Sequence, residues 1–420
     1  MKIYSIIALF AAFGSLNAET LTQSEAIETA LKNNYDVQIS RVSADIDKAN
    51  NTPGNAGLLP TAAIEGSGTY AYDMGGDENI SRGALSGGVA LAWTIYDGGK
   101  MYVTRDRLAE IEALGELNYR NQVMQTVYNV TGAYCEIARL TRNLETTREL
   151  IEYNNTLVQI AETGFNAGDR PKNDMLLAKI DLNTARQSET TVLYSIQIAK
   201  QKLNEYMGVN GNFDYEVETG SAENMPDINR EEYLQKMNSG NLDLKAIEMQ
   251  IEIARYAYQE TSTASMPTVQ INGGYYLTKN FTSSDAGNDN FTHGPQVGAS
   301  LSIPLFTAGE NDRKANVAQL EVQNAEIEKS KLLLSLNIEL ENTISDYENQ
   351  RNLLALEREN GTMAKENFEI NLERFRNGET TAVDVRQARN ELQSSNSRLA
   401  DYEYAVKLAD TKLKLMIGEL

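Results

Sequence analysis

The strongest constraint on this fold is a seven-residue apolar repeat in the stretch 123–165. Every seventh residue there is apolar: Val123, Val130, Ile137, Leu144, Ile151, Val158 and Phe165. Such a repeat keeps one seam against a neighbouring helix only when the helices supercoil left-handedly. Because no proline interrupts the sequence from Gly99 to Phe165, the pattern predicts one helix of roughly 100 Å. A helix of that length needs neighbouring helices along all of it, unlike the helices of about three to four turns in an ordinary globular domain.

The seven-residue pattern returns later in the chain, which indicates a tandem duplication. At an offset of 210 positions the same seam reads Leu333, Leu340, Tyr347, Leu354, Gly361, Phe368 and Phe375. Pro60 has its counterpart in Pro267 at an offset of 207, so the second copy is longer by 210 − 207 = 3 residues in its hairpin loop. We therefore divide the exported chain into a first repeat at 19–208, a polar and acidic linker at 209–226, and a second repeat at 227–420.

Ahead of each long helix the apolar period changes from seven to two, which is typical of strands. The predicted strands are about 61–73, 85–96, 268–279 and 295–306. The predicted long helices are about 99–165 and 310–376, and the predicted hairpin loops are 74–84 and 280–294. One face of each strand is apolar or glycine-rich and the other is mostly polar. Each repeat therefore reads as a strand hairpin followed by a long helix and a returning helix.

The first 18 residues have the features of an export signal. Lys2 supplies a positive start, an apolar stretch follows at 3–13, and Ala18 closes the cleavage region. The alternative is a buried N-terminal helix. No cysteine follows the signal, so lipid attachment at the N-terminus is not expected. Beyond residue 18 no apolar run approaches the ~20 residues of a membrane helix, so the exported chain crosses a membrane by strands or not at all.

Charge and residue content argue against several classes of function. The chain has 38 Lys+Arg and 59 Asp+Glu, a net charge of −21, which would repel nucleic acid and, in a pore, attract cations. One cysteine, Cys135, and one histidine, His293, cannot form an intrachain disulfide or a His/Cys zinc cluster. Most carboxylates alternate with Lys and Arg on helices, which indicates solvated faces. We expect no enzyme activity, no cofactor and no metal site.

The strands decide the class of protein. Each is long enough for the ~9–11 tilted residues that cross a bilayer, and its two faces suit a water-filled barrel in lipid. Four strands cannot close a barrel, because the smallest transmembrane barrels have about eight, and an open sheet edge in lipid is prohibitive. Several copies of the chain must then share one barrel. The alternative is a soluble sheet beneath a helical layer.

Distinctive junctions join the second strand of each repeat to its long helix. Their residues are Tyr96, Gly98, Gly99, Pro304, Phe306 and Gly309. Together with Leu-Leu-Pro at 58–60 and the tandem copy, these junctions resemble the TolC family of outer-membrane efflux proteins. The resemblance covers essentially everything after the signal. One departure is Thr94, which stands where the family often has proline.

The resemblance implies a mainly α-helical protein with membrane β-strands. It implies a homotrimer whose four strands per protomer build a shared 12-stranded barrel in outer-membrane lipid, continued by a long coiled-coil α-barrel in the periplasm of a Gram-negative bacterium. Its partners would be a periplasmic adaptor (membrane fusion) protein and an inner-membrane transporter of resistance-nodulation-division or ABC type. The expected function is a passive exit duct of a tripartite efflux or type I secretion system, with the cargo left open.

Two sites are expected at the turns between the long and returning helices. These turns lie at the opposite end of each repeat from the strand hairpins, so we expect them to dock the adaptor. The turn residues are Gly168, Asp169, Arg170, Gly378, Glu379 and Thr380. The resemblance places Asp174 and Asp384 at a closed periplasmic mouth, where three protomers would contribute six aspartates. One turn further on, Gln387 stands where some members carry a second acid, which would make the ring of charge weaker. The alternative for each aspartate is helix capping.

Two other functions remain open. A periplasmic coiled-coil scaffold would explain the helices but leave the four amphipathic strands unused. A stand-alone diffusion porin would use the strands but would not need a helical tube of ~100 Å. A mass measurement in detergent and a single-channel conductance separate these three possibilities.

Overall fold

The computed structural model describes residues 19–73, 80–211, 215–219, 226–282 and 290–420. The predicted export signal and parts of both predicted hairpin loops, 74–79 and 283–289, lie outside the described residues. The chain forms two compact units, and each draws on both repeats. Unit 1 comprises the residues up to Ile39, Arg120–Asn241 and Ser335–Leu420, and unit 2 comprises Ser40–Tyr119 and Leu242–Leu334. The compact units thus cut across the sequence repeats, because each long helix contributes its first part to unit 2 and its remainder to unit 1.

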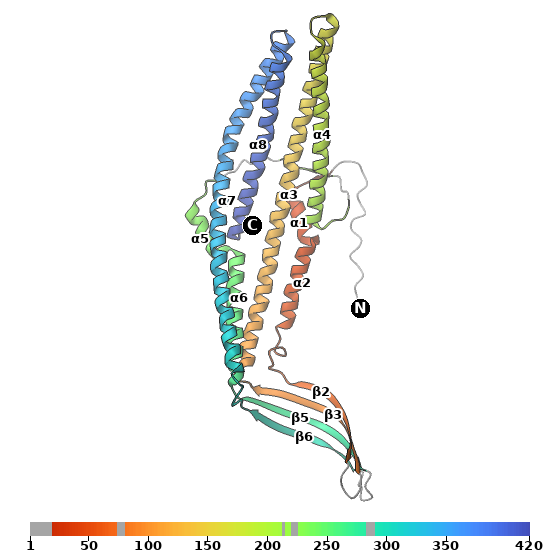
Figure 1. Ribbon diagram of the computed structural model, residues 1–420, viewed down its shortest axis with the longest axis vertical. Helices are drawn as coiled ribbons and strands as arrows, with labels where there is room; N and C mark the ends of the chain where they lie inside the picture. Colours follow the sequence, from red (N-terminus) through yellow and green to blue (C-terminus); the bar gives the residue numbers. More distant parts are fainter. Residues whose placement is uncertain (1–18, 74–79, 212–214, 220–225, 283–289) are drawn as a thin grey trace. The chain divides into compact units, whose positions relative to one another are not determined.

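Unit 2 contains a four-stranded antiparallel sheet in the order β2-β3-β5-β6 (Figure 1). The strands are β2 (Thr61–Asp73), β3 (Ile80–Tyr96), β5 (Thr268–Thr282) and β6 (Asn290–Ser302). Because β3 pairs with β5, the hairpin of the first repeat continues into the hairpin of the second. The register shifts between Thr94 and Tyr96, at the helix end of β3.

The register gives the sheet an apolar face and a polar face. Residues directly opposite each other in an antiparallel pair lie on the same face. Ile64, Val89 and Tyr275 form one such row across β2, β3 and β5. On the other face Ser67 pairs with Ser86, and their hydroxyl oxygens are 2.7 Å apart. The alternation in the sequence therefore assigned the two faces correctly.

The strand ends differ from the sequence prediction. β3 begins at Ile80 rather than 85, and β5 continues to Thr282 rather than ending at 279. β6 spans Asn290–Ser302 rather than 295–306. Pairing continues through polar residues because the ladder hydrogen bonds join backbone groups and do not require an apolar side chain. β6 ends two residues before Pro304, which has no N–H to donate to a neighbouring strand.

The helices of unit 2 are joined by ion pairs. They are α6 (Leu242–Ser262) and parts of α2 (Tyr35–Asn50), α3 (Lys100–Ala167) and α7 (Glu310–Arg376). Arg107 of α3 pairs with Glu260 of α6 at 2.8 Å, and Arg255 of α6 pairs with Glu326 of α7 at 3.0 Å. At the start of α3 the Asp97 carboxylate accepts the backbone N–H of Met101 at 3.0 Å. This bond satisfies one of the free donors of the first turn.

Unusual backbone angles mark the two strand-to-helix junctions. Gly98 has φ +74°, and a Cβ there would lie 2.4 Å from Cβ of Met266, so both the angle and the space require glycine. Its counterpart in the second repeat is Ala308, a non-glycine residue with φ +50°. Gly99 and Gly309 also have positive φ, of +90° and +73°. The glycines expected from the sequence thus build both bends, while Ala308 is strained.

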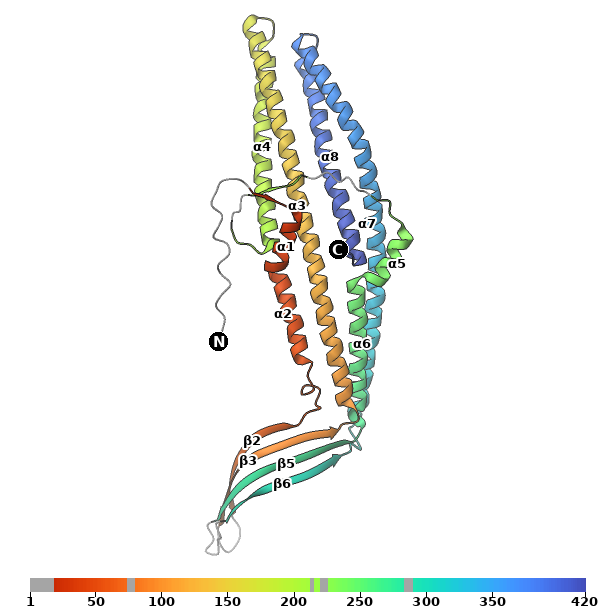
Figure 2. The same cartoon turned by 180° about the vertical axis from the view of Figure 1, so that it is seen from behind.

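Unit 1 is built from two helical hairpins. α4 (Lys172–Met207) returns along α3, and α8 (Ala382–Ile417) returns along α7 (Figure 2). Two short helices, α1 (Gln23–Asn33) and α5 (Arg230–Gly240), lie beside them, and β1 (Glu19–Leu21) pairs in parallel with β4 (Tyr215–Val217). No helix in the described part of the chain is long and apolar enough to span a membrane.

The seven-residue seam supplies much of the core of unit 1. Val130 and Ile137 of the first repeat are buried in one cluster, and Phe368 and Phe375 of the second are buried in another. The last position of the first seam differs, since Phe165 is 37 % exposed while its counterpart Phe375 is 1 % exposed. The two copies therefore use the same pattern but are not packed identically near the helix turns.

Candidate gate and docking site

The two helix turns of unit 1 have the same backbone. In the α3–α4 turn the N–H of Asp169 donates to Gly164 O at 2.9 Å, and in the α7–α8 turn that of Glu379 donates to Arg374 O at 2.8 Å. Gly168 and Gly378 have φ of +80° and +76°, the left-handed conformation in which glycine commonly ends a helix. A Cβ at either glycine would meet no atom within 4 Å, so the requirement for glycine is one of backbone angle alone.

The six turn residues predicted to dock an adaptor are mostly exposed. Gly168, Asp169, Gly378 and Glu379 are exposed, whereas Arg170 and Thr380 are half-buried. Arg170 is half-buried because its guanidinium carbon lies 4.0 Å from the ring centroid of Phe375. Its Nη2 also donates to Phe375 O at 2.8 Å. Arg170 thus connects the first turn to the end of α7.

Asp384 acts as a helix cap. Its Oδ2 accepts the hydroxyls of Thr381 at 2.6 Å and Thr380 at 2.8 Å, and also the backbone N–H of Thr381 at 3.1 Å. The backbone N–H of Asp384 in turn donates to the Thr381 hydroxyl at 3.3 Å, which completes a capping box. The hydrogen bonds from Thr381, followed by that from Thr380, lower the pKa of this exposed carboxylate. Gln387 lies exposed one turn further on.

Asp174 occupies the equivalent place in α4 but in a different environment. The residue before α4 is Pro171, which provides no side-chain cap. Asp174 instead lines a cavity of about 20 Å³ together with Phe375, Val383 and Arg386. The structure therefore brings Asp174 to the contact between the two hairpins, while Asp384 is oriented toward its own helix start.

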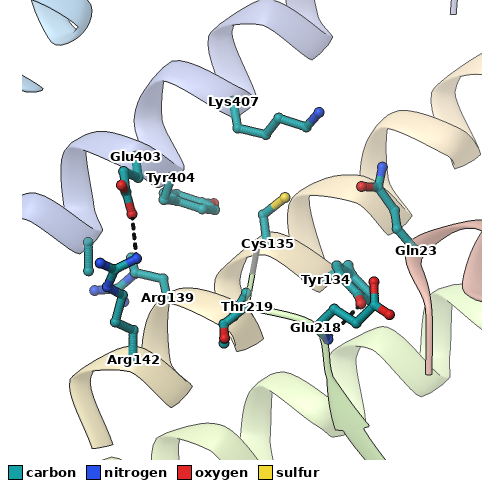
Figure 3. A pocket seen from close by; sticks show the side chains of 12 residues that line it. Gln23, Tyr134, Cys135, Arg139, Arg142, Glu218, Thr219, Glu403, Tyr404 and Lys407 are labelled. Carbon is teal, nitrogen blue, oxygen red and sulfur yellow. Dashed lines mark hydrogen bonds and ion pairs between the residues drawn. The ribbon is translucent and has the colours of Figure 1, made fainter. Parts of the chain in front are cut away.

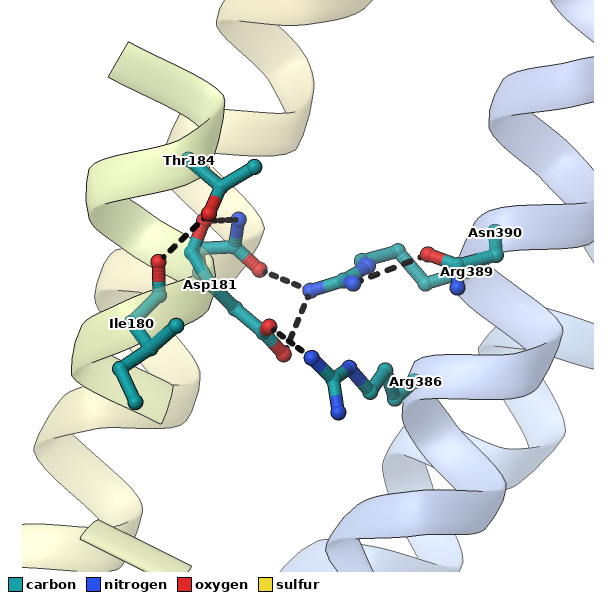
Figure 4. Close-up of polar contacts among 7 residues, drawn as sticks. Ile180, Asp181, Thr184, Arg386, Arg389 and Asn390 are labelled. Atoms are coloured by element: carbon teal, nitrogen blue, oxygen red, sulfur yellow. Dashed lines mark hydrogen bonds and ion pairs between the residues drawn. The ribbon is translucent and has the colours of Figure 1, made fainter. Parts of the chain in front are cut away.

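A buried polar network joins the two hairpins close to these turns (Figure 4). Arg386 Nη2 donates to Asp181 Oδ1 at 2.7 Å, and Arg389 Nη1 donates to Asp181 Oδ2 at 3.3 Å. Arg389 Nη1 also donates to Asn154 Oδ1 at 2.6 Å, and Nη2 donates to Asn390 Oδ1 at 2.9 Å. Arg389 is only 7 % exposed, and burial lowers its pKa. The network links α8 to both α3 and α4.

The comparisons with known proteins agree with this architecture. The family model described as outer membrane efflux protein matches residues 26–209 and 233–419. The chain belongs to the outer membrane efflux protein family. The outer membrane efflux protein BepC of Brucella suis is 23 % identical over 96 % of this chain and 86 % of BepC, and the outer membrane protein TolC of Vibrio cholerae is 23 % identical over 100 % of this chain and 96 % of TolC. The solved CmeC outer membrane channel of Campylobacter jejuni shares the fold, with a TM-score of 0.81 at 18 % identity over 94 % of this chain and 85 % of CmeC.

The outer membrane efflux protein family consists of outer-membrane channel proteins rather than enzymes. In this member a pocket of about 240 Å³ lies between α3 and α8 (Figure 3). Burial raises the pKa of its Cys135 thiol to about 11, so the thiol is protonated at neutral pH. Arg142 in the same pocket pairs with Glu403 at 2.9 Å. Among the described residues no group of acids, histidines and cysteines is arranged to hold a metal ion.

Sequence reasoning missed the buried charges of this efflux protein. Most helix carboxylates are expected to be solvated, and Glu357 is an exception, because it is 5 % exposed and accepts two hydrogen bonds from Arg398 and one from Ser395. Asp181 is a second exception, because the arginines of α8 cover it. The available signal was the position of Arg389 beside Val385 and Ala388, within an apolar stripe of α8.

Proposed function

We propose that the chain forms the outer-membrane exit duct of a tripartite efflux or type I secretion system. The observation that carries the proposal is one sheet with an apolar and a polar face, whose strands lead into single helices of 68 and 67 residues. Two such faces suit a barrel with lipid outside and water inside. Helices of that length extend for about 100 Å, which is enough to cross much of a periplasm. A diffusion porin does not require helices of this length, and a periplasmic scaffold does not require a sheet with an apolar face.

Three copies sharing one barrel would give each edge strand of the sheet a strand to pair with. Within the described strands, β2 and β6 are the edges. An edge in lipid leaves backbone groups without partners, so β6 of one copy would pair with β2 of the next. Three copies of four strands give the 12-stranded barrel that the TolC resemblance implies.

Exposed apolar stripes on the helices support the same assembly. One stripe on α2 consists of Tyr35, Ile39, Val42 and Ile46. A second, on α7, consists of Leu320, Ile327 and Leu334 at a spacing of seven. Stripes with coiled-coil spacing need a partner helix. Because the two stripes lie on different helices, α2 of one copy would pack against α7 of the next in a closed ring.

The strand hairpins would face the cell exterior and the helix turns would face the inner membrane. The turns would then dock a periplasmic adaptor, and through it an inner-membrane transporter of resistance-nodulation-division or ABC type. The export signal would deliver the chain to the outer membrane without N-terminal lipid. Relatives named as outer membrane proteins support this location.

Asp174 and Asp384 would narrow the periplasmic mouth and favour cations, because six carboxylates would crowd around one axis. The structure sharpens the test, because Asp384 also caps α8. Asp384→Asn removes the charge but keeps an acceptor for the cap, and Asp174→Asn removes the charge where no cap exists.

The experiment is purification from membranes in detergent, mass determination and single-channel recording in planar bilayers. We expect a trimer whose resting conductance rises, and whose preference for cations falls, in Asp174→Asn/Asp384→Asn. Asp312→Asn is the control, because it removes an exposed carboxylate from the first turn of α7, at the other end of that helix from the α7–α8 turn, and it should conduct like the wild type. A soluble monomer would contradict the duct, and unchanged ion preference in the double variant would contradict the gate.

A further inference from the structure

Within the described strands, the apolar face of the sheet carries a single full charge. This inference rests on the proposed function, in which that face meets lipid. In the described strands, the apolar-face positions of all four strands contain one Lys, Arg, Asp or Glu, namely Lys279 of β5. The register places Lys279 between Leu85 of β3 and Phe291 of β6. The opposite face contains both Glu65 and Arg82.

Aromatic rings surround Lys279. Phe291 lies directly opposite it, and Phe281 is two residues further along β5 on the same face. The ring of Phe281 covers Gly83, where a Cβ would lie 1.9 Å from the ring. Tyr70 is paired with Gly83 and is exposed on the same face. Such rings are typical of the level at which a barrel leaves the hydrocarbon for the headgroups.

The position of Lys279 along the strand fits this level. At the helix end of the apolar face Trp93 is paired with Ile271, and Lys279 lies eight residues beyond Ile271. Eight residues at about 3.4 Å each, tilted by about 40°, span about 20 Å of depth. That is close to the apolar band of about 25 Å that outer-membrane barrels present. Lys279 therefore lies near the boundary at the hairpin-loop end of the sheet.

A second donor lies diagonally from Lys279. His293 of β6 is paired with Leu277, two residues before Lys279. The hydroxyl of Tyr275 is 2.7 Å from His293 Nδ1. A neutral imidazole has one N–H, so a Tyr275 hydroxyl that donates to Nδ1 leaves the hydrogen on Nε2. His293 then presents an N–H donor on the same face of the sheet, at the position diagonal to Lys279.

We propose that Lys279 and His293 bind the phosphate group of an anionic lipid headgroup in the outer leaflet. The ammonium and the imidazole N–H match a phosphate in charge and in hydrogen bonding, and the face offers no carboxylate as an alternative partner in the described strands. The surrounding rings favour a lipid over a free anion, because they contact the acyl chains of the same molecule.

The test uses the full trimer in nanodiscs of phosphatidylcholine in which one lipid in about five is phosphatidic acid. Native mass spectrometry measures how many phosphatidic acid molecules stay bound to each trimer. We expect Lys279→Gln to lower the apparent affinity about fivefold, the factor that one basic side chain contributes near an anionic surface. Lys279→Arg should retain the lipid, and His293→Gln should weaken retention less than Lys279→Gln.

Arg82→Gln is the matched control, because it removes a charge from the polar face near the same end of the sheet. It should leave lipid retention unchanged. Equal retention by the wild type and Lys279→Gln would overturn the proposal. The proposal would also be overturned if inorganic phosphate, added to pure phosphatidylcholine discs, stabilised the trimer against heat as much as phosphatidic acid does. That result would indicate a site for a free anion. Conductance in the same lipids tests the duct separately, so a conducting trimer without lipid selectivity would refute the headgroup site alone.

Discussion

Replacing Arg389 by methionine tests whether the network between the hairpins holds them together. Methionine keeps most of the apolar volume but removes the bonds of 2.6 Å to Asn154, 3.3 Å to Asp181 and 2.9 Å to Asn390. Asn154 is 1 % exposed, so its Oδ1 would lose a partner that water cannot readily replace.

The expected loss of local stability is about 3 kcal/mol. Breaking a buried ion pair by removing one partner typically costs about 3–5 kcal/mol. The lower end of this range applies because Asp181 keeps its ion pair with Arg386, at 2.7 Å. In addition, the substitution removes the cost of burying the Arg389 charge, which is evident in the lowered pKa of that group.

Amide hydrogen exchange measures this loss where it occurs. Exchange through local opening should accelerate about 100-fold for the α8 amides around Val385 to Leu392, since about 1.4 kcal/mol corresponds to a factor of ten. Lys412→Met is the control, because its pair with Glu339 at 2.8 Å is exposed. The control should change exchange less than about fivefold.

A double-mutant cycle with Asp181→Asn separates the pair from general disruption of packing. The loss of stability in the double variant should be smaller than the sum of the losses in the two single variants by at least about 1 kcal/mol, because both changes remove the same interaction. Strict additivity, or exchange in Arg389→Met within threefold of wild type, would refute the reasoning.

Three further predictions follow from particular residues. Ala308→Gly should raise the free energy of unfolding by about 1 kcal/mol by relieving φ +50°, whereas Gly98→Ala should lower it by more than that; thermal unfolding measures both. The hydrogen bond from Arg398 is the main cause of the lowered pKa of Glu357. The contribution of Glu357 to the free energy of unfolding is therefore present above the unfolded pKa of 4.5 and should be lost as the pH falls through the lower folded pKa. In an acid titration of stability, Glu357→Gln should not show that loss. Arg170→Ala removes the contact with the Phe375 ring and the hydrogen bond to Phe375 O, and it should lower the local stability of the turn by about 1–2 kcal/mol. Protease cleavage at 166–171 should then increase, and cleavage equal to that of the wild type would contradict this prediction.

Local rules predicted much of this fold, and long-range packing accounts for what they missed. The strand faces follow from alternation, and the turns at Gly168 and Gly378 from the positions of the glycines. The cap at Asp384, which was the alternative to a gate role, follows from its spacing to Thr381. Each of these depends on residues close in sequence. The contact of Arg170 with Phe375 joins residues 205 positions apart, and no local pattern specifies it.

Long-range packing also explains why the sequence did not predict the network around Asp181. The buried charges of that region show how the two repeats differ. At the offset of 210, the buried Glu357 and Arg389 correspond to Thr147, which is uncharged, and Lys179, which is exposed, so the buried charges of the second hairpin have no equivalents at those positions of the first. Apolar seams allow helices to slide by small steps, because contacts are exchanged for similar ones. A buried charge has few alternative partners, so displacement of α8 must first break the bonds of Arg386 and Arg389 to Asp181. Separation of the hairpins in this protein is therefore expected to begin as a discrete step at Asp181, rather than as a gradual loosening along the seam.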